Sequence, residues 1–280
     1  MDKIKIVTDS TADLPIEIIE KYDIEVVPLS IVIEGETYLD RVEIEPDEFI
    51  EKMEKTNDLP KSSQPPVGKF VELYEKLIKQ GYKVISIHMT GGMSGTCQSA
   101  ECAAKMVEGD ITVFDSRFIS KALSFQVVEA ARLVKSGESK ESVIKKIIDI
   151  RDSTFLFVAV DTLENLVKGG RIGKGKALLG SLLKLKPIAS LQDGVYTPVA
   201  KVRSHSQVVK FLCEQFAEDV KGKTVKAVGI AHADALELAD NLKKSLYEMM
   251  PELDVDISFT TPVISTHTGK GAIGFMYYTN

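Results

Sequence analysis

The chain has 280 residues, 44% of them hydrophobic and 27% charged, which is typical of a globular protein rather than a disordered, fibrous or membrane protein. At about 150 residues per domain, this length predicts two domains with room for a sizeable core. The formal net charge of −6 and the pI near 5.4 exclude nucleic acid as the main partner, because neutralising phosphates requires a surplus of Lys and Arg.

The first residues, Met1 to Lys5, alternate charged and apolar side chains and have no long apolar run behind them. We therefore expect no signal peptide, no membrane span, a cytoplasmic location and at most transient contact with a membrane. Residues 4–7 are predicted to form a strand, followed by a polar turn at 8–11 and a short helix around 16–19. Polar side chains thus gather at the carboxyl end of this strand.

The next segment combines a hairpin, a helix and a stretch of helix breakers. A β-branched run at residues 26–33, broken by Pro28, turns at Glu34-Gly35 and predicts a hairpin with Pro28 on an edge. Residues 45–53 are expected to be helical. Between residues 56 and 68, the density of Pro, Ser and Asn indicates a semi-rigid, hydroxyl-rich loop and excludes regular structure.

Strands and helices alternate through the rest of the first half. The expected elements are a helix from Phe70 that stops at Gly81, a strand at 84–89, a glycine-rich turn at 91–95, a helix at 96–107, a strand at 111–114, and helices at 118–135 and 140–150. This order is typical of a parallel sheet with crossover helices. We place a domain boundary near Arg151, which gives an N-terminal parallel-sheet α/β domain over residues 1–151.

The second half has a less regular pattern. We expect a strand at 155–160, a helix at 178–183, a hairpin through Asp193-Gly194, a helix from Ser206, a strand at 225–230 and a helix at 236–249. This mixture predicts a C-terminal mixed-sheet α/β domain over residues 152–280. No low-complexity linker separates the two domains, so a ligand is expected between or within them.

Cysteine and histidine spacing gives no ligand set for a metal. The three cysteines are odd in number and lack the paired short spacing of a zinc site, and the four histidines show no HExxH pattern. We therefore predict reduced thiols and no metal. The cysteines are Cys97, Cys102 and Cys213, and the histidines are His88, His205, His232 and His267.

Two glycine-containing segments are candidate anion sites. Residues 90–96 lie between a predicted strand and a predicted helix, where free backbone amides favour a carboxylate or phosphate, although a simple tight turn explains the glycines equally well. Residues 170–177 match P-loop spacing except that Ala177 replaces the magnesium-binding hydroxyl. The preceding strand also ends about ten residues too early for a P-loop. A P-loop-like phosphotransferase is therefore a disfavoured alternative.

A basic segment overlaps the second of these sites. It has no acidic residue, which indicates either a solvated helix face or a surface for an acidic or phosphate-bearing partner. Its basic residues are Lys168, Arg171, Lys174, Lys176, Lys184 and Lys186.

Two further functional classes stay open on the residues alone. A serine hydrolase needs Ser94 or Ser63 beside His267 and an acid such as Asp9 or Asp115, and sequence order does not establish that geometry. A pure interaction module is the other alternative.

Several separated motifs together resemble the DegV family, which includes the acyl-binding subunits of bacterial fatty acid kinase. The resemblance covers nearly the whole chain, and the ordered set is specific although each motif is weak alone. The motifs are Thr8-Asp9-Ser10-Thr11 with Asp13-Leu14-Pro15; Val27-Pro28-Leu29 with Gly35, Tyr38 and Asp40; Ser62-Ser63-Gln64-Pro65; Ser94-Gly95-Thr96 with Gln98-Ser99-Ala100; Asp115-Ser116; Asp161-Thr162-Leu163 through Gly169-Gly170-Arg171-Ile172; Lys186-Pro187-Ile188; and His267-Thr268-Gly269.

The resemblance implies a two-domain DegV-like α/β fold that buries a palmitate-like long-chain fatty acid, with no catalytic residue and no cofactor of its own. It implies that Ser62 and Ser94 hydrogen-bond the carboxylate and that His267 lies close to it; Ser63 and Gly95 complete the predicted head-group site. It further implies that Arg171 is needed when a separate ATP-binding, dihydroxyacetone-kinase-like subunit docks and phosphorylates the carboxylate. On this basis Arg171→Ala is expected to spare acyl binding and impair phosphorylation.

Overall fold

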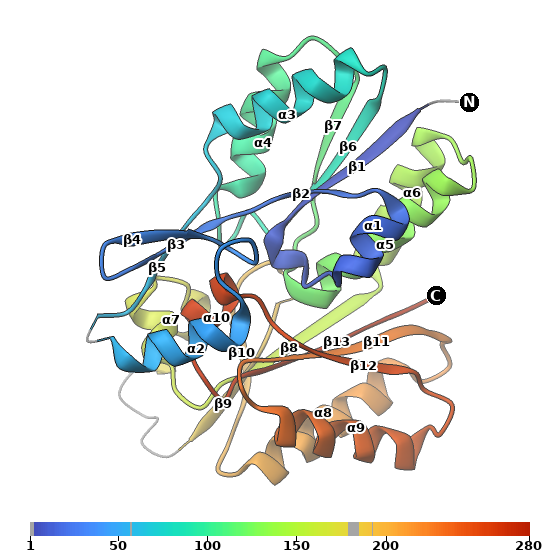
Figure 1. Ribbon diagram of the computed structural model, residues 1–280. Coiled ribbons are helices and arrows are strands. Elements are labelled where there is room, and N and C mark those ends of the chain that lie inside the picture. The colour runs from blue at the N-terminus through green and yellow to red at the C-terminus, as the bar shows by residue number, and fades with distance from the viewer. Residues whose placement is uncertain (1–2, 57, 179–184, 192) are drawn as a thin grey trace.

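Three sheets and the helices packed on them make up the fold (Figure 1). The computed structural model describes residues 3–56, 58–178, 185–191 and 193–280. Within these residues, no helix combines the length and the apolar character needed to cross a membrane. The two larger sheets carry most of the core, and the third adds a strand to the site described below.

The N-terminal sheet is parallel, as predicted. Its strand order is β2-β1-β6-β7, and apolar β-branched residues on β1 and β6 make these strands fit a sheet that is covered on both faces. Helices α3 and α4 lie on one face and α5 on the other (Figure 1). The strands are β1 (Ile4–Asp9), β2 (Glu25–Val27), β6 (Lys83–His88) and β7 (Ile111–Asp115); the helices are α1 (Ile16–Tyr22), α3 (Val67–Lys79), α4 (Thr96–Met106), α5 (Ser120–Lys135) and α6 (Lys140–Asp152).

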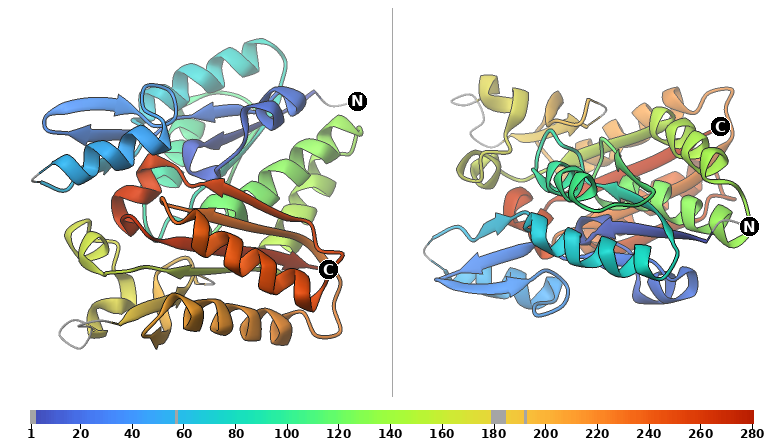
Figure 2. Two further views of the ribbon diagram at one scale, coloured as in Figure 1. Left: turned by 60° about the horizontal axis from the view of Figure 1, so that its bottom comes forward. Right: turned by 90° about the horizontal axis from the view of Figure 1, so that it is seen from above.

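The C-terminal sheet is mixed, which confirms the predicted fold class. Its six strands run in the order β10-β9-β8-β13-β11-β12, with only β11 and β12 parallel. Helices α8 and α9 cover its outer face, opposite α3 and α4 (Figure 2, left). The elements are β8 (Thr154–Ala159), β9 (Lys186–Ser190), β10 (Thr197–Val202), β11 (Val225–His232), β12 (Val255–Phe259), β13 (Ile273–Thr279), α8 (His205–Asp219) and α9 (Leu236–Met249).

Helix α5 packs between the two large sheets. It contacts β1 and β6 on one side and β8, β11 and β13 on the other. The main hydrophobic cluster accordingly contains buried residues from both halves of the chain, among them Ile6, Leu123, Leu156 and Met276. The division into domains 1–151 and 152–280 stays a prediction, but the two halves share this core.

The third sheet corrects the prediction that residues 56–68 lack regular structure. The predicted hairpin is present as β3 (Ser30–Ile33) and β4 (Glu36–Leu39), but Pro28 lies between β2 and β3 rather than within an edge strand. A third strand, β5 (Lys61–Ser63), pairs antiparallel with β3. Proline flanks β5 on both sides, at Pro60 and Pro65, yet prolines outside a strand leave its own amides free to pair at a sheet edge. This pairing fixes Ser62 opposite Ile31.

The remaining elements are short helices. Helix α2 (Pro46–Lys55) confirms a predicted helix, whereas α7 (Glu164–Lys168) and α10 (Pro262–Thr268) were not predicted. Short 3-10 helices occupy Ser10–Ala12 and Gly173–Leu178. Of the helix predicted at 178–183, Leu178 is the last residue of the second 3-10 helix, and residues 179–183 lie outside the described residues. Since α7 and a turn precede residues 170–177, no described strand leads into the P-loop-like segment.

Candidate functional site

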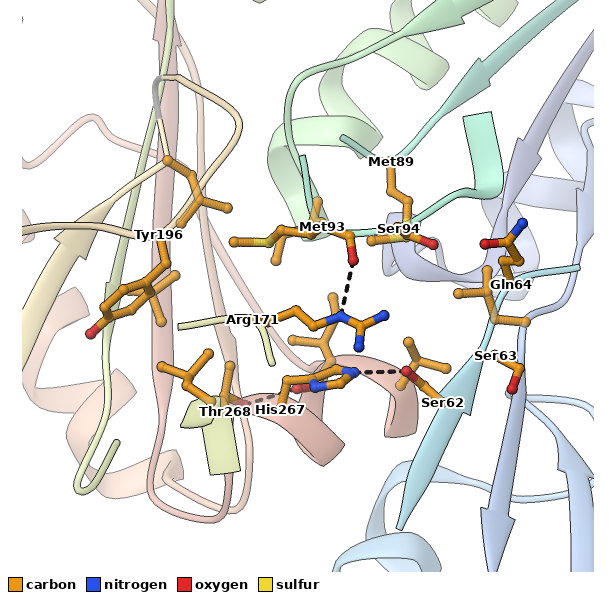
Figure 3. A pocket seen from close by; sticks show the side chains of 17 residues that line it. Ser62, Ser63, Gln64, Met89, Met93, Ser94, Arg171, Tyr196, His267 and Thr268 are labelled. Atoms are coloured by element: carbon orange, nitrogen blue, oxygen red, sulfur yellow. Dashed lines mark hydrogen bonds between the residues drawn. The ribbon is translucent and has the colours of Figure 1, made fainter. Parts of the chain in front are cut away.

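A cavity of about 280 Å³ lies where β5, α10, the carboxyl end of β6 and the six-stranded sheet meet (Figure 3). Most of its wall is apolar, including Leu29, Met89, Val158, Leu191 and Val263. Its polar lining side chains come from separate parts of the chain: Ser62, Ser63, Gln64, Ser94, Arg171, Tyr196, His267 and Thr268. A cavity with apolar walls and a few convergent polar groups is the usual form of a small-molecule site.

Ser62 and His267 form the central polar contact of this site. The Ser62 Oγ lies 2.7 Å from Nε2 of His267, which stands in the last turn of α10 (Figure 3). The pairing of β5 with β3 holds the serine, and α10 holds the histidine, so the contact joins residues that are 205 positions apart. The structure thus brings together two of the predicted carboxylate-binding residues.

The imidazole of His267 is neutral near pH 7. Burial, and secondarily the positive charge of Arg171, lowers the pKa of His267 to about 4. Its buried Nδ1 has no hydrogen-bond partner among the described residues. In the tautomer that carries the proton on Nε2, His267 donates to the Ser62 oxygen and leaves the Ser62 hydroxyl proton free for a ligand acceptor.

Protonation of His267 is expected to destabilise the fold. The pKa is about 4 in the folded protein and near 6.5 in an unfolded chain, so the unfolded state binds more protons between these values. The contribution of His267 to the free energy of unfolding therefore falls as pH decreases from 6.5 to 4 and does not change above this window. Urea unfolding of wild type and His267→Gln should show an excess loss in wild type of about 3 kcal/mol at most. Identical pH profiles would contradict a buried neutral imidazole.

Gly169 packs directly against the imidazole. A Cβ added to Gly169 would lie 2.9 Å from Cε1 of His267, closer still to Nδ1, and 2.9 Å from the carbonyl oxygen of Asn165. The backbone φ of Gly169 is −77°, so alanine meets no torsional strain and only the contacts oppose it. The imidazole therefore depends on the absence of a side chain at this position.

The resemblance seen in the sequence makes palmitate the ligand for a test at this site. We expect Gly169→Ala to push the imidazole away from Ser62 and to lower palmitate affinity about tenfold, the value of roughly one hydrogen bond. Calorimetric titration of single and double variants checks this. In a His267→Ala background the added methyl group has room, so the part of the effect that passes through His267 should vanish. Gly68→Ala is the matched control, because nothing lies within 4 Å of its added Cβ. Additive losses in the double variant would argue against this contact.

Arg171 lies in the cavity wall between Met93 and His267 (Figure 3). Its Nε donates to the carbonyl oxygen of Met93 at 3.0 Å, and its Nη1 donates to that of Gly169 at 2.7 Å. These bonds use two of five guanidinium donors, and the others have no partner among the described residues. The half-buried guanidinium is thus held in place with donors to spare for an anion.

Ser94 contributes a hydroxyl to the opposite wall. Its Oγ accepts from the amide of Thr96 at 3.3 Å and lies 2.9 Å from the Thr96 Oγ1, beside the start of α4. The neighbouring glycine turn is less open to an anion than expected, because the Gly91 amide donates to Asp115 (3.1 Å) and the Gly92 amide to Thr90 Oγ1 (3.1 Å). The hydroxyl of Ser94 is therefore the better supported ligand group of this segment.

The other two predicted head-group residues occupy different positions. Ser63 is exposed and lines the cavity, whereas Gly95 is not among the lining residues and instead packs closely against Gln64. Gln64 lines the cavity, and its Nε2 donates to Ser99 at 2.8 Å. Gln64 was missed as a site residue although it follows the two serines directly.

The geometry gives no support to a serine hydrolase at this cavity. Asp9 pairs with His88 at 3.0 Å rather than with His267, and Asp115 binds the glycine turn. Asp9, His88 and Ser86 do form a hydrogen-bonded chain in the order of a catalytic triad, but none of the three is exposed to solvent. His267 therefore lacks the acid that orients a catalytic histidine.

Three lysines of the basic segment form ion pairs with acidic residues, which reduces the local positive charge that the composition of the segment indicates. Lys168 pairs with Glu164 of the same helix at 2.6 Å, Lys174 pairs with Asp193 at 3.1 Å, and Lys186 pairs with Asp161 at 2.5 Å. Lys184 lies outside the described residues. What remains at the cavity is the charge of Arg171.

A smaller, inner cavity of about 20 Å³ adjoins the first. The two share Ile119, Val158, Ile264 and Thr268, and the inner one reaches Leu156 and Met276. This inner region lies between α5 and the six-stranded sheet. An extended apolar ligand with its polar end at Ser62 would point its tail in this direction.

Comparisons of the sequence with known proteins identify the same protein family. A family model described as "Uncharacterised protein, DegV family" matches residues 3–280. A DegV domain-containing protein of Listeria monocytogenes is 45% identical over 281 residues, covering 100% of both chains. Both measures span the whole sequence rather than one half.

Solved structures agree with this result. The crystal structure of DegV from Bacillus subtilis, described as a fatty acid binding protein, superimposes with a TM-score of 0.91 at 36% identity and covers 100% of each chain. A stearic acid-binding protein from Eubacterium ventriosum has a TM-score of 0.89 at 26% identity, covering 99% of this chain and 98% of its own.

Proposed function

The chain belongs to the DegV family, and we propose that it binds a long-chain fatty acid and presents the carboxylate to a separate ATP-dependent kinase subunit. The observation that carries this proposal is the cavity, whose apolar wall ends at a cluster formed by Ser62, Ser94, Arg171 and His267. This is the arrangement that an acyl chain with one charged end requires. The chain itself is proposed to act by binding rather than by catalysis.

The polar cluster suits a carboxylate. Two hydroxyls and the free donors of Arg171 supply hydrogen bonds and positive charge, while the neutral His267 adds a donor through Ser62 without a second full charge. A carboxylate held in this way keeps its own negative charge, so its oxygens stay able to attack a phosphoryl group. The exposed Ser63 and Gln64 mark the side from which a partner would reach it.

The apolar wall supports the acyl part. Each buried methylene contributes about 0.8 kcal/mol, so a chain of a dozen or more methylenes gains enough to offset the cost of ordering it. The wall residues Met89, Val158 and Leu191 offer no hydrogen bond to a tail. Selectivity for a long chain over a short one follows from this additive term.

Mass spectrometry of the freshly purified and denatured protein tests the binding half. We expect a released fatty acid, and stoichiometric binding of palmitate by the protein after its lipid has been removed. A protein that releases no fatty acid and does not bind palmitate on titration overturns the proposal. Hydrolysis of aryl esters by the isolated chain, abolished by Ser94→Ala, would favour a hydrolase instead.

The proposed presentation of the carboxylate to a kinase subunit has a separate test. The palmitate-loaded protein, MgATP and an ATP-binding dihydroxyacetone-kinase-like subunit should together form an acyl phosphate, which hydroxylamine traps as a hydroxamate. Neither protein alone should give this product. Palmitate binding with no hydroxamate in the complete mixture would leave a fatty-acid-binding protein and remove the kinase role.

A further inference from the structure

Helix α10 supplies much of one wall of the cavity. Val263, Ile264, His267 and Thr268 all line it, so a small shift of this seven-residue helix moves both apolar and polar parts of the site. The helix has no side-chain cap of its own, because its N-cap residue Thr261 makes no capping hydrogen bond. Its first amides are therefore satisfied from elsewhere.

Asp13 reaches the start of α10 from the turn after β1. Its Oδ1 accepts from the amide of Thr261 at 2.9 Å, and its Oδ2 accepts from the hydroxyl of Thr260 at 2.9 Å and from that of Ser120 at the start of α5. Asp13 is 2% exposed and has a left-handed φ of 48°. A residue other than glycine in this conformation is held there by its contacts.

Asp40 reaches the same helix end from the loop after β4. Its Oδ1 accepts from the amide of Val263 at 3.3 Å, and its Oδ2 accepts from Ser10 at 2.6 Å. The Ser10 oxygen in turn accepts from the amide of Leu29, a lining residue of the cavity, at 3.1 Å. Two carboxylates from the N-terminal half thus replace the missing cap of α10.

The surroundings of these carboxylates are nearly closed to solvent. Burial raises the pKa of Asp40 to about 7, and the positive charge of Arg41 opposes this shift. Burial also raises the pKa of Asp13, and the charges of Lys121 and Arg41 oppose it. A buried carboxyl of this kind is costly unless its hydrogen bonds are made. The amides of α10 and the favourable end of its dipole provide part of that compensation.

We propose that Asp13 and Asp40 are positioning residues, which fix α10 across the two halves of the protein and so hold His267 against Ser62. The consequence for fatty acid binding rests on the proposed function; the placement of the imidazole does not. The same inference gives a role to the motifs Thr8–Pro15 and Gly35–Asp40, whose residues do not line the cavity.

The test compares Asp13→Ala and Asp40→Ala with wild type in two measurements. With 15N-labelled histidine, the NMR signals of His267, assigned through His267→Gln, should move toward those of Ser62→Ala in both variants. Palmitate affinity should fall at least tenfold. Asp40→Asn keeps a carbonyl oxygen for the Val263 amide, so its His267 signals should resemble those of wild type. This variant can still be measured if an alanine variant does not fold.

Val143→Ala, a core truncation on α6 outside the cavity wall, is the control for lost stability and should leave the His267 signals in place. Unchanged His267 signals in the folded aspartate variants overturn the proposal, whatever the affinities are. If wild type itself binds no palmitate, the proposed function fails, while the NMR comparison in the unliganded protein still decides the role of Asp13 and Asp40.

Discussion

Val158→Phe is expected to abolish high-affinity binding of palmitate while sparing a short acyl chain. Val158 lies on β8 and lines both the cavity and the smaller one beside it, so a larger side chain there fills apolar space that the proposed acyl chain needs. Denying four methylenes to the cavity costs about 3 kcal/mol, or roughly a 200-fold loss of affinity. Calorimetric titration with palmitate and with octanoate measures the two affinities.

The enlarged core also carries strain of about 1–3 kcal/mol, so a matched control is needed. Ala159→Leu adds bulk on the neighbouring residue, which faces the opposite cluster under α8 and α9, and should cost stability without affecting palmitate. If Val158→Phe binds palmitate as wild type does, the acyl chain takes another path. If both variants lose palmitate equally, the loss reflects folding rather than the cavity.

Arg171→Glu is expected to weaken palmitate binding at least 100-fold. The guanidinium lies in the cavity wall beside His267, and a carboxylate about 4–6 Å from a unit charge interacts with it by roughly 3–4 kcal/mol at an effective dielectric constant near 20. Charge reversal turns this attraction into repulsion. Titration at constant ionic strength measures the change, and Arg171→Ala should give an intermediate loss.

Lys176→Glu provides the same change in net charge on the exposed 3-10 helix of the same segment. It should leave palmitate affinity within a factor of two or three, since screened surface charges act weakly. Equal losses of palmitate affinity in the two variants would mean that the net charge of the protein, and not the residue in the cavity wall, determines that affinity. The resemblance implied that Arg171→Ala spares acyl binding. Because Arg171 lies in the cavity wall, we now expect it to contribute to acyl binding as well.

Sequence patterns predicted the parts of the fold whose signal is local. The apolar runs of β1, β6 and β8 and the helical spacing of α3 and α9 identify their elements without any partner in view. The strand β5 was missed because three residues between prolines carry no periodicity; its pairing with β3 is a long-range contact. Helix α10 and β13 escaped for a related reason, since Gly269, Gly271 and Gly274 break the pattern around them.

The site was predicted through resemblance rather than through pattern. Motif order pointed to Ser62, Ser94 and His267, and the structure brings all three to one cavity. No sequence pattern reveals that Gly169 touches the imidazole or that Asp40 reaches α10, because both are contacts between distant segments. A count of charges within residues 168–186 also leaves out the acidic partners Glu164, Asp193 and Asp161, which lie outside that range.

The shared helix α5 has a consequence for how a ligand enters. Two lobes that each had their own interior would be free to swing about a hinge and open the cavity between them. Here one helix is packed on both large sheets, so swinging them apart exposes apolar surface on each side at once. We expect a ligand to enter instead by displacement of the small elements β5 and α7 at the cavity, and we expect the two sheets that share α5 to unfold together.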